Sequence, residues 1–134
     1  MKAAIISIIF SIAFGCIQQT KNKKVRMNEE FSLGVNQRVS VNTEGLMIEF
    51  VTVLEDSRCP VGVDCVWEGN AKIRIKISKS DMGATTIELN TNLEPTNILF
   101  QDYKIHLVRL EPQPKVGTTT KAEDYSATLL IAKR

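Results

Sequence analysis

The sequence lacks the residue patterns of several common catalytic and metal-binding sites. It contains one histidine and three cysteines among 134 residues, whereas a structural zinc site needs about four ligands. It has no Cys-x-x-Cys pair, no Gly-x-Ser-x-Gly nucleophile motif and no glycine-rich phosphate loop. The histidine, His106, falls on the polar side of an alternating segment and is a poor general base for a triad. We therefore predict no catalytic residue, no metal and no cofactor.

The sequence also lacks a large excess of charge of one sign and a long apolar run. It has 17 basic and 15 acidic residues, for a net charge of +2. A nearly neutral chain is not drawn to nucleic acid by its overall field, so no nucleic-acid partner is expected. The apolar stretch at 3–14 is shorter than the roughly 20 residues that a bilayer-spanning helix needs. A permanent transmembrane anchor is therefore not predicted.

The N-terminus instead has the order of a secretory signal. Lys2 supplies a positive charge, 3–14 form the apolar region, and small residues follow. Ala-Phe-Gly-Cys at 13–16 resembles the lipobox of bacterial lipoproteins. The resemblance implies cleavage before Cys16, acylation of Cys16, and a lipid anchor in the bacterial cell envelope, expected on the periplasm-facing outer membrane. The alternative is an ordinary cleaved signal that leaves Cys16 as a free thiol.

The other two cysteines fit the same compartment. If Cys16 is acylated, Cys59 and Cys65 remain as an even pair in an oxidising environment, where a disulfide between them is expected. Residues 16–29 are polar, rich in basic side chains and without periodicity, so we predict a flexible tether. It is either a plain solvated linker or one that is also attracted to anionic headgroups. The predicted organisation is a signal at 1–15, a tether at 16–29 and one folded domain at 30–134.

Within that domain, strand patterns recur and no segment shows helical periodicity. Apolar and basic residues alternate strictly over 71–77, which predicts a strand with one buried face. Extending this alternation backward places Trp67 and Gly69 on the core side. Further strands are predicted at 31–35, 39–41, 45–54, 85–89, 98–100, 103–110 and 126–132. We predict an all-β fold, a single antiparallel β-sandwich or small barrel of about seven to eight strands.

Residues 55–70 carry the most individual motif, Asp-Ser-Arg-Cys-Pro followed by Cys-x-Trp-x-Gly. It is similar to a motif of small, largely uncharacterised bacterial envelope lipoproteins of β architecture. That resemblance implies a fold and a location, and no activity. Two interpretations of the residues stay open. Arg58 pairs with Asp56 or Glu68, or stacks on Trp67, and holds the loop shut. Alternatively, Arg58, Trp67 and Asp56 face a partner, since Arg and Trp are enriched at binding hot spots.

The function that these observations favour is a membrane-tethered, noncatalytic binding or structural module. Its partner would be another envelope protein or a polymer, contacted through the disulfide loop or through the long polar segment 112–124. That segment is either a mobile connector or functional. One alternative is an inhibitor-like module that presents a disulfide-rigid loop to an envelope enzyme. Another is an enzyme of unrecognised type. The sequence leaves the oligomeric state open.

Overall fold

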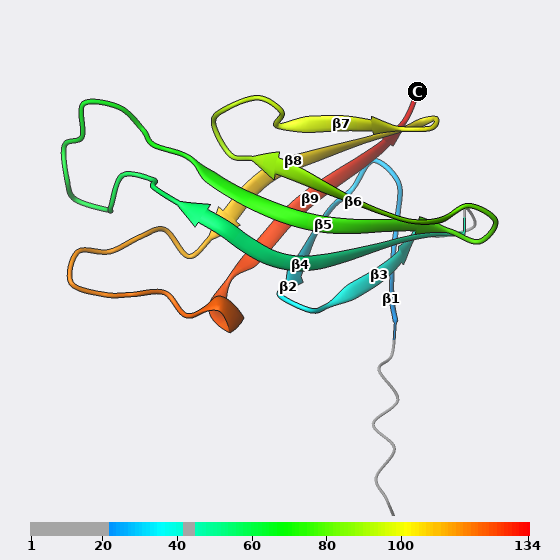
Figure 1. Ribbon diagram of the computed structural model, residues 1–134, viewed down its shortest axis with the longest axis horizontal. Coiled ribbons are helices and arrows are strands. Elements are labelled where there is room, and N and C mark those ends of the chain that lie inside the picture. Colours follow the sequence, from blue (N-terminus) through cyan, green and yellow to red (C-terminus); the bar gives the residue numbers. More distant parts are fainter. Residues whose placement is uncertain (1–21, 42–44) are drawn as a thin grey trace, which may run out of the picture.

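The protein folds into two stacked β-sheets (Figure 1). The computed structural model describes residues 22–41 and 45–134. One sheet has the strand order β1-β3-β4-β5-β6 and the other the order β2-β9-β8-β7. The described residues form nine strands and one 3-10 helix: β1 (Lys23–Val25), β2 (Glu30–Gly34), β3 (Arg38–Val41), β4 (Leu46–Asp56), β5 (Ala71–Lys79), β6 (Gly83–Asn90), β7 (Asn97–Phe100), β8 (Tyr103–Glu111), η1 (Ala122–Asp124) and β9 (Ser126–Lys133). Because neither sheet closes on itself, the predicted β-sandwich is confirmed and the barrel alternative is not realised.

The sandwich core lies between the two sheets and is built by alternation. In β5, Ile73, Ile75 and Ile77 are completely buried, and the basic residues between them point outward. β4 pairs with β5 antiparallel, with Ile48 opposite Ile77, and β9 pairs with β8 in the same way. The opposite sheet contributes residues of the same kind to the core, the largest being Tyr103, Leu33, Ile105, Leu107 and Leu110. Each of the eight predicted strands is present.

The folded domain begins earlier than the predicted residue 30. β1 lies inside the predicted tether and pairs in parallel with β3, with Val25 opposite Val41. Val25 is buried in the core, and this burial offsets the cost of ordering a short charged segment. The five-stranded sheet is therefore mixed and not purely antiparallel. The predicted signal, Cys16 and tether residues 16–21 lie outside the described residues.

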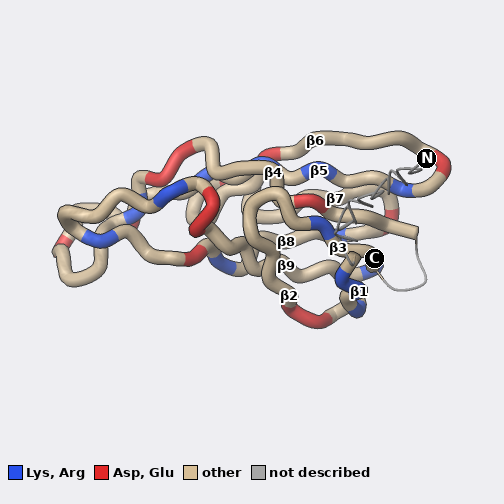
Figure 2. Tube along the Cα trace, turned by 90° about the horizontal axis from the view of Figure 1, so that it is seen from below, with Lys and Arg blue, Asp and Glu red and all other residues tan. Residues whose placement is uncertain are grey.

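Loops lie at both ends of the long axis of the sandwich. The β4–β5 and β8–β9 loops project together beyond the sheets at one end, on the left of Figure 1. The β5–β6 turn lies at the other end. Turned by 90°, the molecule shows β6 running along one margin (Figure 2). None of the helical structure in the described residues is long and apolar enough to cross a membrane.

Candidate functional site: a braced loop end

Two loops meet at the projecting end of the sandwich, residues 57–70 between β4 and β5 and residues 112–125 between β8 and β9. We call them together the loop end. A disulfide joins Cys59 and Cys65, with the two Cα atoms 5.9 Å apart, as predicted. Backbone hydrogen bonds from Ser57 N to Asn70 O and from Cys59 N to Glu68 O continue the β4–β5 pairing into the loop. The disulfide loop therefore grows directly from the central strands.

Arg58 joins the two loops from the inside. Its side chain is only 5% exposed and binds Asp56 through two hydrogen bonds, Nε to Oδ1 at 2.8 Å and Nη2 to Oδ2 at 2.7 Å. The same guanidinium donates to the backbone carbonyls of Leu110 and Pro112. Of the predicted partners for Arg58, the structure thus selects Asp56 and neither Glu68 nor Trp67. The charged groups of Arg58 and Asp56 bind each other inside the loop end and are nearly buried, so they are not displayed on its outer surface.

Tyr125 completes this network from the far end of the second loop. Its hydroxyl donates to Asp56 Oδ2 at 2.9 Å. Burial alone raises the pKa of Asp56, but the hydrogen bonds from Arg58 and Tyr125 outweigh it and hold that pKa below its usual value. Burial, and then the bond to the carboxylate, raise the pKa of Tyr125. The carboxylate is thus kept charged and the phenol neutral, the states that this network needs.

A second set of polar contacts fixes the base of the disulfide loop. Gly69 has a φ of +74°, and a Cβ atom there would lie 1.9 Å from the carbonyl oxygen of Ser57. The buried Asn70 next to it donates to Asn90 Oδ1 at 2.9 Å. Its own side-chain oxygen accepts from the backbone N–H groups of Asn92 and Leu93. Sequence reasoning missed Asn70, whose only signal is a polar residue immediately before an alternating strand.

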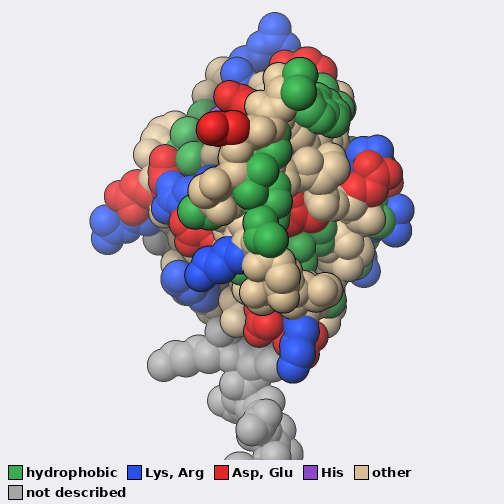
Figure 3. Space-filling view, turned by 90° about the vertical axis from the view of Figure 1, so that its left-hand side faces the viewer, with side chains coloured by type: hydrophobic (Ala, Val, Ile, Leu, Met, Phe, Trp, Pro, Cys, Tyr) green, Lys and Arg blue, Asp and Glu red, His purple; other side chains and the backbone are tan. Residues whose placement is uncertain are grey.

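The outer surface of the loop end carries exposed apolar side chains among charged and polar ones. Four apolar side chains are more than half exposed: Val61, Val66, Trp67 and Val116. Figure 3, which faces this end, shows apolar side chains in a stripe across it. The hydrogen bond from Val61 N to Pro114 O, 2.9 Å long, ties the two loops together. Exposed apolar side chains on a loop pair braced from within form a preorganised surface.

Trp67 lies on this surface and not in the core, so its predicted core position is wrong. The indole is 62% exposed, whereas Gly69 is buried as predicted. The backward extension of the alternation fails because the chain bends at Val66 and Trp67, and β5 begins only at Ala71. The period of two applies only where the backbone is extended.

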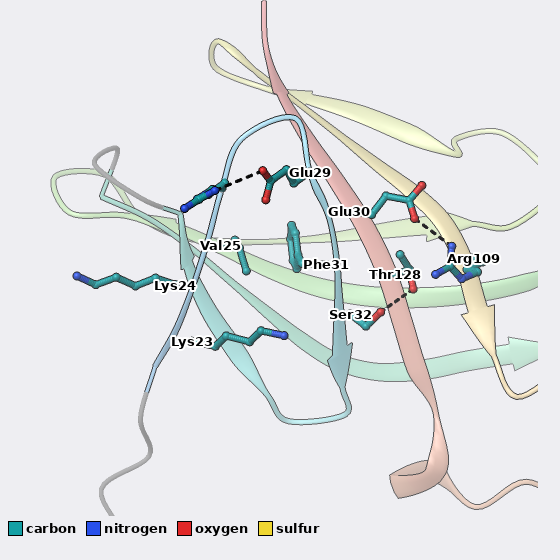
Figure 4. Close-up of a pocket in the computed structure, with 10 residues that line it drawn as sticks. Lys23, Lys24, Val25, Glu29, Glu30, Phe31, Ser32, Arg109 and Thr128 are labelled. Carbon is teal, nitrogen blue, oxygen red and sulfur yellow. Dashed lines mark hydrogen bonds and ion pairs between the residues drawn. The ribbon is translucent and has the colours of Figure 1, made fainter.

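A charged groove lies elsewhere, between β1 and β2 (Figure 4). It has a volume of about 480 Å³. Its carboxylates are already paired, Glu30 with Arg109 at 3.0 Å and Glu29 with Arg26 at 3.8 Å. These pairs are solvent-exposed and of the kind that contributes little energy. In Figure 4 the Lys24 side chain points away from the groove. No catalytic arrangement emerges among these residues.

Metal ligands do not gather in the part of the chain that the structure describes. Residues 22–41 and 45–134 contain no group of three or more His, Cys, Asp or Glu side chains placed to hold an ion. His106 lies with Nδ1 3.2 Å from the carbonyl oxygen of Thr96, in a backbone contact beside β7.

The fold and the loop end define a class of protein: a small β-sandwich domain whose disulfide-closed, internally braced loops display apolar side chains. Comparison with protein-family models, with curated proteins and with solved structures found no match to this chain.

Proposed function

We propose that the protein is a lipid-anchored lipoprotein of the bacterial cell envelope whose sandwich is a noncatalytic binding module, with the loop end as its binding surface. The anchor rests on the signal-like N-terminus and on Cys16 in its lipobox-like setting. The binding role rests on one observation. Val61, Val66, Trp67 and Val116 are exposed together on loops that the Arg58–Asp56–Tyr125 network and the disulfide hold in place.

Rigidity is what makes this surface suited to binding. A loop that is already ordered loses little conformational entropy when a partner binds, so more of the contact energy appears as affinity. Tryptophan is among the residue types most enriched at binding hot spots, where its large ring fills a pocket. The loop end thus has an anchor side chain, an apolar surround and a stiff support.

The charges of the disulfide loop narrow the chemistry of the partner. Asp64 and Glu68 are exposed beside Trp67, and Arg58, the loop's one cation, is buried. The second loop adds the exposed Lys115 and Lys121 and the exposed Glu123 and Asp124, so exposed acidic side chains outnumber basic ones on the loop end. This excess of carboxylates disfavours an anionic lipid surface and favours an envelope protein with an apolar pocket and a basic rim. We expect association with such a partner to slow as ionic strength rises, because long-range attraction is screened.

An inhibitor-like module is the second candidate function. The observation that favours it is the loop between Cys59 and Cys65, which projects beyond both sheets and is closed at its base (Figure 1). A stiff projection of this kind fits an enzyme cleft. Assays of envelope hydrolases with and without the protein test this function. Inhibition that disappears on Trp67→Ser would support it, and unchanged turnover across the hydrolases would contradict it.

A matched pair of variants tests the binding surface. Trp67 is 62% exposed at the loop end, and Met82 is 64% exposed in the β5–β6 turn at the opposite end. The lipidated protein, Trp67→Ser and Met82→Ser are used as baits in a crosslinking pull-down from the native envelope. We expect a protein recovered by the wild type and by Met82→Ser, and lost with Trp67→Ser, while all three baits have the same melting temperature. Equal recovery by Trp67→Ser and the wild type would contradict the proposal.

A further inference from the structure

β6 presents a free edge of the five-stranded sheet. It is eight residues long and pairs on one side with β5, from Gly83 opposite Lys79 to Asn90 opposite Lys72, without a register shift. No strand among the described residues pairs with its other side, where the one backbone hydrogen bond among these residues is at the last residue, from Asn90 N to Pro95 O at 2.9 Å. Figure 2 shows it along the margin of the molecule. A regular edge of this length presents a row of N–H and C=O groups able to pair with another strand.

The other three edge strands are shorter or carry charges that discourage pairing. β1 has three residues, of which two are lysines, and β7 has four. β2 has five residues and begins at Glu30, which is paired with Arg109. Short edges and edge lysines are the devices that keep sheets from joining. β6 has none of these devices: it contains no lysine, no proline and no bulge.

The side chains of β6 suit pairing with a copy of the same strand. Its single charge, Glu88, is balanced by Arg74 of β5 at 3.1 Å. In an antiparallel pair centred on Thr86 or on Ile87, Glu88 lies opposite Ala84 or Thr86 of the other copy, so no like charges lie directly opposite each other. Ile87, which is half-buried at the rim of the core, then lies opposite a threonine or a second isoleucine. Cross-strand pairs of β-branched residues stabilise a sheet.

We infer that β6 is a self-association edge at which two copies of this chain join their five-stranded sheets antiparallel, β6 to β6. Pairing of two strands buries less than the roughly 1,200–2,000 Å² of a standard stable interface, so the contact is weak and concentration-dependent. Tethering to one membrane surface would favour it by raising the local concentration. The edge is separate from the loop end, and its test does not depend on the loop-end partner.

Thiol crosslinking of the full chain in the native envelope tests this edge. Thr86→Cys places an exposed thiol at the centre of β6, and a short thiol-reactive crosslinker is added. In an antiparallel pair the two introduced thiols lie opposite or diagonal to each other, within about 8 Å. Met82→Cys is the matched control, because it is an exposed site in the β5–β6 turn. In the same pair its two copies lie roughly 27–34 Å apart, given about 3.4 Å per residue.

We expect Thr86→Cys to give a crosslinked dimer, and Met82→Cys to give no more dimer than the wild type. Absence of a dimer with Thr86→Cys would overturn the inference. Equal crosslinking at both positions would overturn it too, because random collision favours the thiol in the turn. If the Thr86→Cys variant were crosslinked only to a different protein, β6 would pair with a strand of that protein. The inference that β6 pairs with a second copy of this chain would then be overturned as well.

Discussion

Replacing Arg58 with methionine removes the side chain that joins the two loops from the inside. Methionine keeps an unbranched apolar stem of similar length but donates no hydrogen bond. The substitution removes both bonds to Asp56 and the donors to the carbonyls of Leu110 and Pro112. The Asp56 side chain, 11% exposed, would keep only the Tyr125 hydroxyl and a long bond from a backbone amide. A nearly buried carboxylate would thus lose its counter-charge.

The expected cost follows from that uncompensated charge. Removing one partner of a buried ion pair costs about 3–5 kcal/mol. Domains of this size have unfolding free energies of about 5–15 kcal/mol, so the loss is a large share of the total. Arg74→Met is the matched control, because Arg74 pairs with Glu88 at the surface, where both side chains are 40% or more exposed. Breaking that exposed pair should cost less than about 1 kcal/mol.

Urea denaturation of the wild type and the two variants measures the difference. We expect a much lower midpoint for Arg58→Met and a midpoint near that of the wild type for Arg74→Met. Adding Asp56→Asn to Arg58→Met should restore part of the loss, because it removes the orphaned charge. If Arg58→Met cost no more than Arg74→Met, the internal brace would be refuted, and Arg58 would again be a candidate for the binding surface.

Three further predictions concern the glycines, the acid limit and the anchor. Gly69→Ala should cost more than about 4 kcal/mol in chemical denaturation, because its Cβ meets a backbone carbonyl. Gly62→Ala, also at positive φ but in open space, should cost about 1–2 kcal/mol, and equal costs would contradict this account. The folded-state pKa of Asp56 lies below its ordinary value of 3.8, so its contribution is present above that pH and is lost as the pH falls further. Asp56→Asn should therefore flatten the fall of unfolding free energy below that pH, and an unchanged slope would count against the network. Cys16→Ser should abolish acyl labelling and release the protein from membranes, and unchanged membrane association would refute the anchor.

The strands were predictable because their local pattern and their burial agree. In β5 and β8 the alternation of apolar and polar residues is the alternation of inward and outward side chains. β1 was not predictable, because it has three residues and only Val25 is apolar. Its place is set by β3 and by the core, which a local pattern does not contain. Short edge strands depend on tertiary contacts in this way.

The loop end was predictable only in part. The even pair left once Cys16 is set aside, together with an expected oxidising compartment, predicted the disulfide, and Asp56 was among the partners predicted for Arg58. The sequence could not show which residue Arg58 binds, because its position is also fixed by the carbonyls of Leu110 and Pro112. These lie more than 50 residues away along the chain. In the structure Arg58 is buried inside the loop end and Trp67 is exposed on its surface. The binding candidate therefore moves from the charged residue to the apolar surface around Trp67.

A position-resolved crosslinking experiment tests the central claim, that the loop end is the binding surface, most directly. A photoreactive side chain is placed at Val66 or Val116 in the loop end, or at Leu99 on β7, all of which are at least half exposed. Each full-length protein is illuminated in the native envelope and its adducts are compared. We expect one adduct shared by positions 66 and 116 and missing at 99. The same adduct at all three positions, or one at position 99 alone, would contradict it.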